Sequence, residues 1–250
     1  MHMYIDTWNN CHASICSITF SDHKNERIGS GTGFKVGSHL VTNNHVYVAP
    51  GAVDVELQFM NEDGNTAAAS KKISYQEFQS RLKIGLPENS WDYAILSIPD
   101  NEFSAIPSLT LSQSSIVRIG HPVVALGFQF DQSNLSIKQG ILSSRFIKAD
   151  VKYIQIDASV NQGDSGGPLI NPDNNQVIGI ITRKHTETVN MQLRPTKVIV
   201  FGSPAVGTNL MIANQSIANE LPLKMTVWED EKGVYGYLFH GFQKWQVNMA

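Results

Sequence analysis

The chain has 250 residues, enough to bury a hydrophobic core without disulfides or metals, and its length alone allows one large domain or two small ones. Its apolar share of 42% is ordinary, and its glycines and prolines are spread along the chain, which indicates a globular protein rather than a disordered or fibrous one. The net charge of −3 disfavours a general nucleic-acid partner. No apolar run approaches the length of a membrane span, so no spanning segment is expected.

The two cysteines, Cys11 and Cys16, fall on one predicted strand. Their offset of five places them on opposite faces, about 16 Å apart if the strand is extended. A disulfide between them would need a bend, so we expect two reduced thiols packed as small apolar groups. This cysteine usage, together with an N-terminus that lacks the apolar core of a signal peptide, favours a cytoplasmic or periplasmic bacterial protein.

Short segments rich in strand-forming residues recur along the chain, with turn signals such as Asp63-Gly64 between them. This pattern favours a β-sandwich or β-barrels over an alternating α/β sheet. The stretch from Ser104 to Arg118 is predicted to connect two β units. The predicted strands are Ala13–Phe20, Gly31–Val36, His39–Thr42, Val53–Phe59, Tyr93–Ile98, Val123–Phe128, Ser136–Ser143, Tyr153–Ile156, Pro168–Ile170, Val177–Thr182 and Lys197–Phe201.

The last part of the chain departs from this pattern. Asn209–Leu221 predicts a strand that passes into a short helix, which Pro222 ends. Leu223–Trp228 and Val234–Phe239 predict a β-hairpin with aromatic residues on both arms. We expect this hairpin either to cover the core or to expose an aromatic surface to a protein partner.

A glycine-rich loop, Gly163-Asp164-Ser165-Gly166-Gly167, lies between two apolar runs and is predicted to join two strands. The plainer interpretation is a tight hairpin that contains an ordinary serine. Catalysis by a serine needs a base within hydrogen-bond reach and a third group that orients the base.

His45 and Asp92 are the candidates for these two roles. His45 follows the predicted strand His39–Thr42, at a turn, where its orientation can be fixed beside the core; a structural or exposed histidine is the alternative. Asp92 precedes the apolar run Tyr93–Ile98, and a carboxylate that enters a buried strand needs a partner such as an imidazole N–H. Capping of the strand is the alternative for Asp92.

Three stretches taken together closely resemble the chymotrypsin/trypsin-like serine proteases, in which His, Asp and Ser occur in this order. They are Gly31-Thr32-Gly33-Phe34 with His39-Leu40-Val41-Thr42-Asn43-Asn44-His45-Val46, then Trp91-Asp92-Tyr93-Ala94-Ile95-Leu96, then Gly163-Asp164-Ser165-Gly166-Gly167-Pro168. The bacterial Deg/HtrA branch is most similar to this chain in two places: the sequence around His45 and the segment Gln155–Asn161 before the serine loop.

The resemblance implies Ser165 as nucleophile, His45 as general base and then acid, and Asp92 as the group that holds the imidazole tautomer. It implies an oxyanion hole made of the backbone N–H groups of Gly163 and Ser165. It also implies an all-β fold of two packed six-stranded antiparallel β-barrels, with the site in the cleft between them.

The domain organisation expected from this is a protease domain over 1–222, with barrel one at about 10–103 and barrel two at about 117–222. A short helix would end that domain, and the C-terminal β-hairpin extension would cover 223–250.

Asp164 has the residue identity of the secreted trypsins but lacks the chain end that pairs with it there. Secreted trypsins pair this Asp with a new Ile/Val N-terminus made by cleavage, but Arg27-Ile28-Gly29-Ser30 lies too close to Gly31 and His45 to supply one. Deg/HtrA members usually carry Asn at the position. Activation by cleavage is therefore not expected, and the partner of Asp164 is open.

The resemblance also suggests where a substrate binds. Ser159 would lie near the base of the S1 pocket, Gln162 beside the cleft, and Thr182 and Arg183 along one wall. An uncharged Ser159 favours an apolar P1 side chain, the substrate residue before the cleaved bond. Arg183 and Lys184 either face solvent or attract acidic groups.

The function expected is a serine endopeptidase that acts through an acyl-enzyme on protein or peptide substrates, without a cofactor or a metal. The alternative is a gated or inactive binding module on the same scaffold, with the C-terminal hairpin as its interaction surface. An esterase or other acyl hydrolase is a third possibility, supported only by the catalytic triad that such enzymes share with serine proteases.

Overall fold

The structure is a computed structural model that describes residues 3–87, 90–99, 101–112, 117–129, 132–148 and 151–182, and the backbone of four strands between 195 and 246. The chain divides into two compact units, Met1–His185 and Thr186–Ala250. The predicted boundary between residues 222 and 223 lies outside the described residues and stays a prediction.

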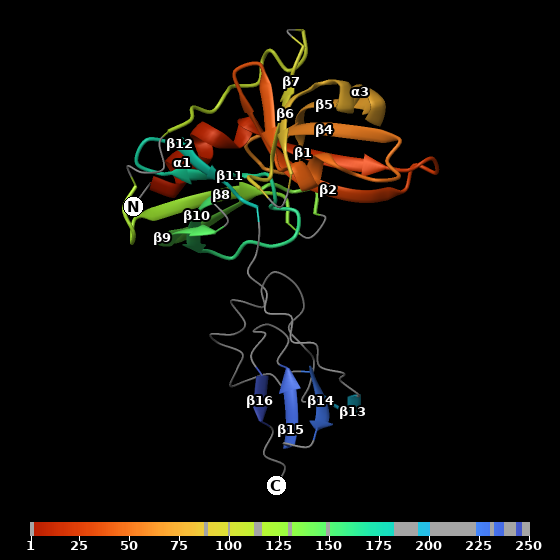
Figure 1. Ribbon diagram of the computed structural model, residues 1–250, viewed down its shortest axis with the longest axis vertical. Helices are drawn as coiled ribbons and strands as arrows, with labels where there is room; N and C mark the ends of the chain where they lie inside the picture. The colour runs from red at the N-terminus through yellow and green to blue at the C-terminus, as the bar shows by residue number, and fades with distance from the viewer. Residues whose placement is uncertain are drawn as a thin grey trace. The chain divides into compact units, whose positions relative to one another are not determined.

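The first unit is built on two antiparallel sheets, labelled in Figure 1. The larger sheet has seven strands in the order β5-β4-β1-β2-β3-β7-β6. These strands are β1 (Ile15–Ser21), β2 (Arg27–Val36), β3 (His39–Thr42), β4 (Asp54–Met60), β5 (Ala67–Ser74), β6 (Leu82–Leu86) and β7 (Tyr93–Ser97).

The smaller sheet has five strands in the order β10-β9-β8-β11-β12. They are β8 (Pro122–Gly127), β9 (Ser136–Lys148), β10 (Val151–Asp157), β11 (Pro168–Asn171) and β12 (Gln176–Ile180). The helices described in this unit are short: α1 (Met3–Cys11), α2 (Asn44–Tyr47) and α3 (Tyr75–Ser80), with a 3₁₀ turn at His12–Ser14.

The prediction of an all-β fold with two β units is confirmed, but the strands divide as seven and five in the described residues rather than six and six. β5 and β6 are absent from the predicted strands for a physical reason. β5 buries only Ile73, and β6 exposes its three central residues, so neither edge strand shows the alternation that predicts a half-buried strand. The predicted helix at Asn209–Leu221 lies outside the described residues.

A shared hydrophobic cluster packs the two sheets against each other. It joins Phe34 and Val41 of the larger sheet to Val124, Leu126 and Ile170 of the smaller one. Because β2 and β3 meet β8 and β11 here, the loops at the ends of these strands come close together, and the candidate site is built from those loops.

The two cysteines are free and buried, as predicted. They do not share a strand, however: Cys11 ends α1 and Cys16 lies in β1. Burial raises the pKa of the Cys11 thiol to about 11, so that thiol stays protonated at neutral pH.

The second unit contains a four-stranded antiparallel sheet in the order β13-β14-β15-β16. Its strands are β13 (Pro195–Val200), β14 (Lys224–Asp230), β15 (Gly233–Tyr237) and β16 (Lys244–Gln246). β14 and β15 form the predicted hairpin, with Thr226 opposite Tyr237. The hairpin is thus part of a four-stranded sheet, whereas its sequence predicted only two paired strands.

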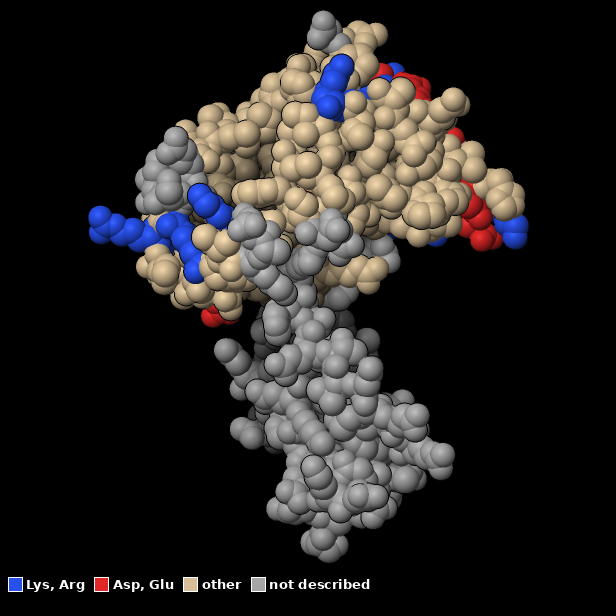
Figure 2. All heavy atoms as spheres, in the orientation of Figure 1, with Lys and Arg blue, Asp and Glu red and all other residues tan. Residues whose placement is uncertain are grey.

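The surface of the first unit is mixed in charge. On the face drawn in Figure 2, most of the described side chains are uncharged, and the Lys, Arg, Asp and Glu side chains lie toward the margins. No helix in the described ranges has both the length and the apolar character needed to span a membrane.

Candidate active site

His45 and Asp92 are brought together by strand pairing. β3 and β7 pair antiparallel, with Thr42 opposite Ala94, so the helix that follows β3 lies beside the residue that precedes β7. The His45 Nδ1 lies 2.8 Å from Asp92 Oδ2, and the backbone N–H of His45 donates to Asp92 Oδ1 at 3.1 Å. With both carboxylate oxygens bonded to one residue, the imidazole is held in a fixed orientation and its Nε2 is left for other partners.

Asp92 is almost fully buried, with 3% of its surface exposed, and it has a positive φ of 50°. The hydroxyl of Thr182 donates a short hydrogen bond to Oδ2, and the side-chain amide of Asn43 donates to the Asp92 carbonyl at 2.8 Å. Burial by itself would raise the pKa of this carboxyl. Hydrogen bonds from His45 and Thr182 outweigh burial and hold the pKa of Asp92 below its ordinary value.

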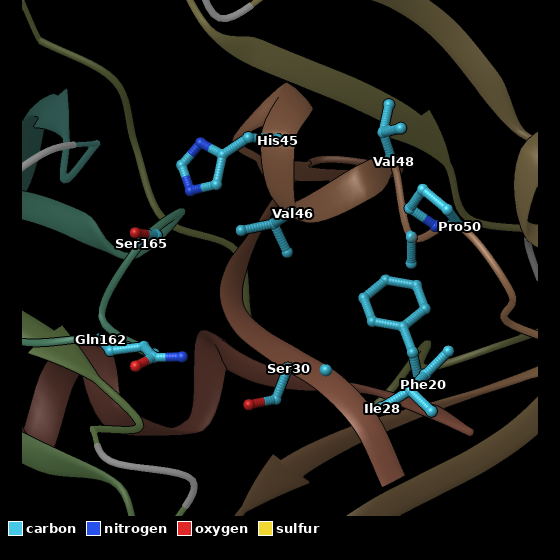
Figure 3. A pocket seen from close by; sticks show the side chains of 12 residues that line it. Phe20, Ile28, Ser30, His45, Val46, Val48, Pro50, Gln162 and Ser165 are labelled. Atoms are coloured by element: carbon cyan, nitrogen blue, oxygen red, sulfur yellow. The ribbon is translucent and has the colours of Figure 1, made fainter. Parts of the chain in front are cut away.

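Ser165 lies in the loop between β10 and β11, and with His45 it lines one pocket of about 290 Å³. Figure 3 shows the imidazole of His45 turned toward the side chain of Ser165. The Ser165 hydroxyl donates a long hydrogen bond, 3.5 Å, to the carbonyl of Thr182. Across the part of the chain that the structure describes, no hydrogen bond joins Ser165 to His45.

Around Ser165 the backbone carbonyls of Gly163 and Asp164 are engaged, while two N–H groups are left open. The Gly163 carbonyl accepts from the Thr32 hydroxyl at 2.7 Å, and the Asp164 carbonyl accepts from the Gly167 N–H at 3.0 Å. In a trans peptide the C=O and N–H point in opposite directions, so the second bond also fixes the direction of the Ser165 N–H. Among the described residues, the N–H groups of Gly163 and Ser165 donate to no acceptor.

Two glycines of this loop are required by its shape. Gly166 has a φ of 86°, and a Cβ there would lie 2.0 Å from the Thr32 carbonyl oxygen. Gly163 has a φ of 94°, and a Cβ would lie 2.1 Å from the carbonyl oxygen of Phe128. The loop therefore packs its backbone directly against neighbouring strands, which only residues without a side chain allow.

The candidate substrate-binding residues fall in different places. Gln162 is exposed and lines the pocket, whereas Ser159 is exposed before the serine loop and does not line it. The Thr182 hydroxyl is bonded to Asp92. Arg183 lies outside the described residues. The predicted roles of all four in binding substrate stay predictions.

The pocket itself is walled by apolar side chains beside His45. They come from the start of β2, from α2 and from the segment that follows α2, and they include Ile28, Val46, Val48 and Pro50. In the described ranges, no three His, Cys, Asp or Glu side chains gather in a way that could hold a metal ion.

Two residues with evident structural roles at the site had no role in the sequence-based prediction. Thr32 lies inside the Gly31-Thr32-Gly33 motif, and only the structure shows that its hydroxyl and backbone N–H bond to Gly163 and Ser165. Lys138, which contacts Asp164, lies far from every motif, and no local pattern marks it. Contacts of this kind depend on the pairing of distant strands.

Comparison with known proteins identifies the family of the first unit. The family described as "Trypsin-like peptidase domain" matches residues 31–180, and a "Domain of unknown function DUF302" matches residues 176–239. The mouse "Serine protease HTRA4" is 34% identical over 183 residues, covering 69% of this chain and 33% of its own length. The human "Serine protease HTRA3" is 30% identical over 192 residues, covering 71% and 38%.

A solved structure, "HtrA-type protease AlgW with tripeptide", aligns with 71% of this chain and 53% of its own chain, with a TM-score of 0.56 and 23% identity. At this identity the likeness supports the fold alone. The chain spans about a third of the length of the mouse protein and somewhat more of the human one.

Proposed function

The chain belongs to the trypsin-like peptidase family, and from this premise we propose that it is a serine endopeptidase in which His45, Asp92 and Ser165 form the catalytic triad. The observation that carries the proposal is the buried Asp92 bonded to His45 Nδ1, in a pocket that His45 and Ser165 line together. A buried carboxylate that orients an imidazole, in a pocket shared with a serine hydroxyl, provides the three kinds of group that acyl transfer needs.

In the proposed mechanism, Ser165 Oγ turns from the Thr182 carbonyl toward His45 Nε2 by a change of side-chain rotamer. Nε2 takes the hydroxyl proton as Oγ attacks the substrate carbonyl, and Asp92 stabilises the imidazolium that forms. His45 then protonates the leaving amine, which leaves an acyl-enzyme. Water, activated by the same imidazole, hydrolyses the ester and restores Ser165.

The N–H groups of Gly163 and Ser165 are proposed as the oxyanion hole. Their support is that both are unbonded among the described residues, while the neighbouring carbonyls are engaged elsewhere. Donors aimed at charge that develops only in the tetrahedral intermediate lower the barrier, and losing one typically costs about 3 kcal/mol.

An apolar P1 residue is proposed for the substrate. Its support is the absence of a charged side chain at Ser159, the position that the family resemblance places at the pocket base. A library of peptides that differ only at P1 tests this, and a preference for Lys, Arg or Glu would reject it.

A gated or inactive binding module is the second candidate. The observation in its favour is that the Ser165 hydroxyl bonds to Thr182 rather than to His45 in the described residues. A loop that rests in a non-productive state and is shifted by a ligand would give this geometry.

The test of the proposed function is Ser165→Ala. Turnover of casein and of apolar peptides should fall by several orders of magnitude, because the nucleophile is lost, while the melting temperature stays near that of the wild type. Cleavage by the variant at the wild-type rate would overturn the assignment.

A further inference from the structure

The partner of Asp164, left open by the sequence, is Lys138 in the structure. The Asp164 side chain is 2% exposed, and its Oδ1 accepts from Lys138 Nζ at 2.5 Å. Its Oδ2 accepts from the backbone N–H of Asn161 at 2.7 Å. Both carboxylate oxygens are therefore used, and neither is bonded to His45 or Ser165.

Lys138 is itself buried and held in place by the smaller sheet. Its side chain is 9% exposed, and its ammonium also donates to Ser136 Oγ at 2.8 Å. The Ser136 hydroxyl donates in turn to the Gly127 carbonyl at 2.9 Å, across the paired strands β8 and β9. The cation is therefore positioned by the paired strands β8 and β9, and its partner Asp164 lies on the serine loop.

Gly127 makes room for the carboxylate. A Cβ at this residue would lie 2.7 Å from Asp164 Oδ1 and 3.1 Å from the Asp164 Cα. The strand β8 thus lets the loop approach to a distance that no other residue would allow. Together, Gly127, Ser136 and Lys138 form a site built for one carboxylate.

The pair fixes the residue that lies between the two candidate oxyanion donors. Asp164 follows Gly163 and precedes Ser165, so its backbone belongs to the peptide that carries the Ser165 N–H. An isolated carboxylate this deeply buried is unfavourable, and removing its cation favours any rearrangement that takes it into water. Such a rearrangement would turn the adjoining peptides and carry the N–H groups away from the substrate.

We propose that Lys138 is a positioning residue, which holds the loop 161–167 in the conformation that presents the Gly163 and Ser165 N–H groups to the substrate carbonyl oxygen. The proposal rests on the proposed function, because it explains what keeps the two N–H groups of the proposed oxyanion hole available to a substrate. A lysine within the chain supplies the cation, so the pair forms without a new chain end.

The test compares Lys138→Met with Lys152→Met, a matched change on the exposed face of the neighbouring strand β10. Two quantities are measured in the full-length chain: hydrogen exchange of the peptide that covers 161–167, and kcat and KM on a peptide substrate. Lys138→Met should speed exchange in 161–167 and lower kcat by about 100-fold, the scale of losing one oxyanion donor, with KM changed far less. Lys152→Met should leave both unchanged.

A double variant, Lys138→Met with Asp164→Asn, separates the ion pair from simple packing. An amide at 164 can still accept from the Asn161 N–H but leaves no uncompensated charge, so kcat should recover by about tenfold or more over Lys138→Met. If Lys138→Met does not fold, Asp164→Asn alone serves, and faster exchange in 161–167 with lower kcat is the expected result.

The proposal is overturned if Lys138→Met is folded and keeps wild-type kcat and wild-type exchange in 161–167. It is equally overturned if the melting temperature falls while exchange in the loop and kcat do not change, since the pair would then contribute to stability alone. Failure of the proposed function looks different: the wild-type chain itself would have no measurable turnover, whereas the exchange comparison does not depend on activity.

Discussion

Asp92 is the residue on which the geometry of the site converges. Its carboxylate accepts from the imidazole and the backbone of His45 and from the hydroxyl of Thr182, and its carbonyl accepts from Asn43. Its positive φ, uncommon for a residue other than glycine, is held by these bonds at the entrance to β7. A carboxylate so bonded keeps its charge, which is the property that an imidazole needs from its orienting partner.

The low pKa of Asp92 gives a pH-dependent prediction. A carboxyl whose pKa is lower in the folded than in the unfolded chain adds stability above the ordinary aspartate pKa of about 3.9, and this stability is lost as the pH falls from there toward the folded value. Asp92→Asn should therefore melt below the wild type at neutral pH, and the gap should narrow on acidification below about pH 4. Its kcat should fall by about 10⁴-fold at neutral pH, because the tautomer is no longer fixed. Thermal melts across pH test this, and a gap that does not vary with pH would contradict it.

The residues proposed as the triad could be singled out from the sequence because each lies in a short motif next to a predicted strand. Lys138 and Thr182 show the limit of that reasoning. The side chain of Lys138 reaches Asp164 only because β9 pairs with β8, and Thr182 reaches Asp92 across 90 residues of chain. The spacing of residues in the local sequence predicts neither contact.

At the scale of elements, Thr32 of β2 joins the larger sheet to the serine loop. Its N–H donates to the Ser165 carbonyl at 2.9 Å, its hydroxyl donates to the Gly163 carbonyl, and its own carbonyl accepts from Thr42 at 2.7 Å. The loop is therefore held from both sides, by β2 on the larger sheet and by β8 and β9 on the smaller one. The core strands that make these contacts could be predicted from their apolar runs, whereas β5 and β6, on the exposed edges of the larger sheet, could not.

This packing predicts a difference between two glycines that have nearly the same φ. Gly166 and Gly120 have φ of 86° and 87°, but a Cβ at Gly120 would meet nothing within 4 Å, whereas at Gly166 it would meet the Thr32 carbonyl. Gly120→Ala should cost about 1–2 kcal/mol of unfolding free energy from backbone strain alone. Gly166→Ala should cost clearly more, about 3 kcal/mol or above, because the loop must also shift. Urea denaturation measures the unfolding free energy of both variants. Equal losses would contradict the prediction, because they would show that the loop accommodates the added methyl group without a further loss of stability.

At the scale of the whole molecule, the chain joins a trypsin-like unit to a second unit with its own four-stranded sheet. Every described residue of the candidate site lies in the first unit, Met1–His185. The hairpin in the second unit could be predicted from its two strand-forming arms and the turn between them. Its membership of a larger sheet could not, because β13 lies far before β14 in the sequence and β16 has only three residues.

Deletion of residues 223–250 tests the role of the C-terminal hairpin, because it removes β14, β15 and β16 from the second unit. We expect the shortened chain to keep its rate of peptide cleavage and its oligomeric state, because no described site residue is removed. Kinetic assays and size-exclusion chromatography on both chains make the comparison. A clear loss of turnover would instead favour the gated alternative, with the C-terminal unit acting on the site.

Ser165 is proposed as a nucleophile that His45 activates, and labelling with a fluorophosphonate, followed by mass spectrometry of the modified peptide, tests this. The wild-type chain should gain one adduct, located on Ser165, and His45→Ala should react far more slowly, because its serine has lost the base. Ser165→Ala should gain none. An unlabelled wild-type chain, or an adduct that persists in Ser165→Ala, would contradict the account.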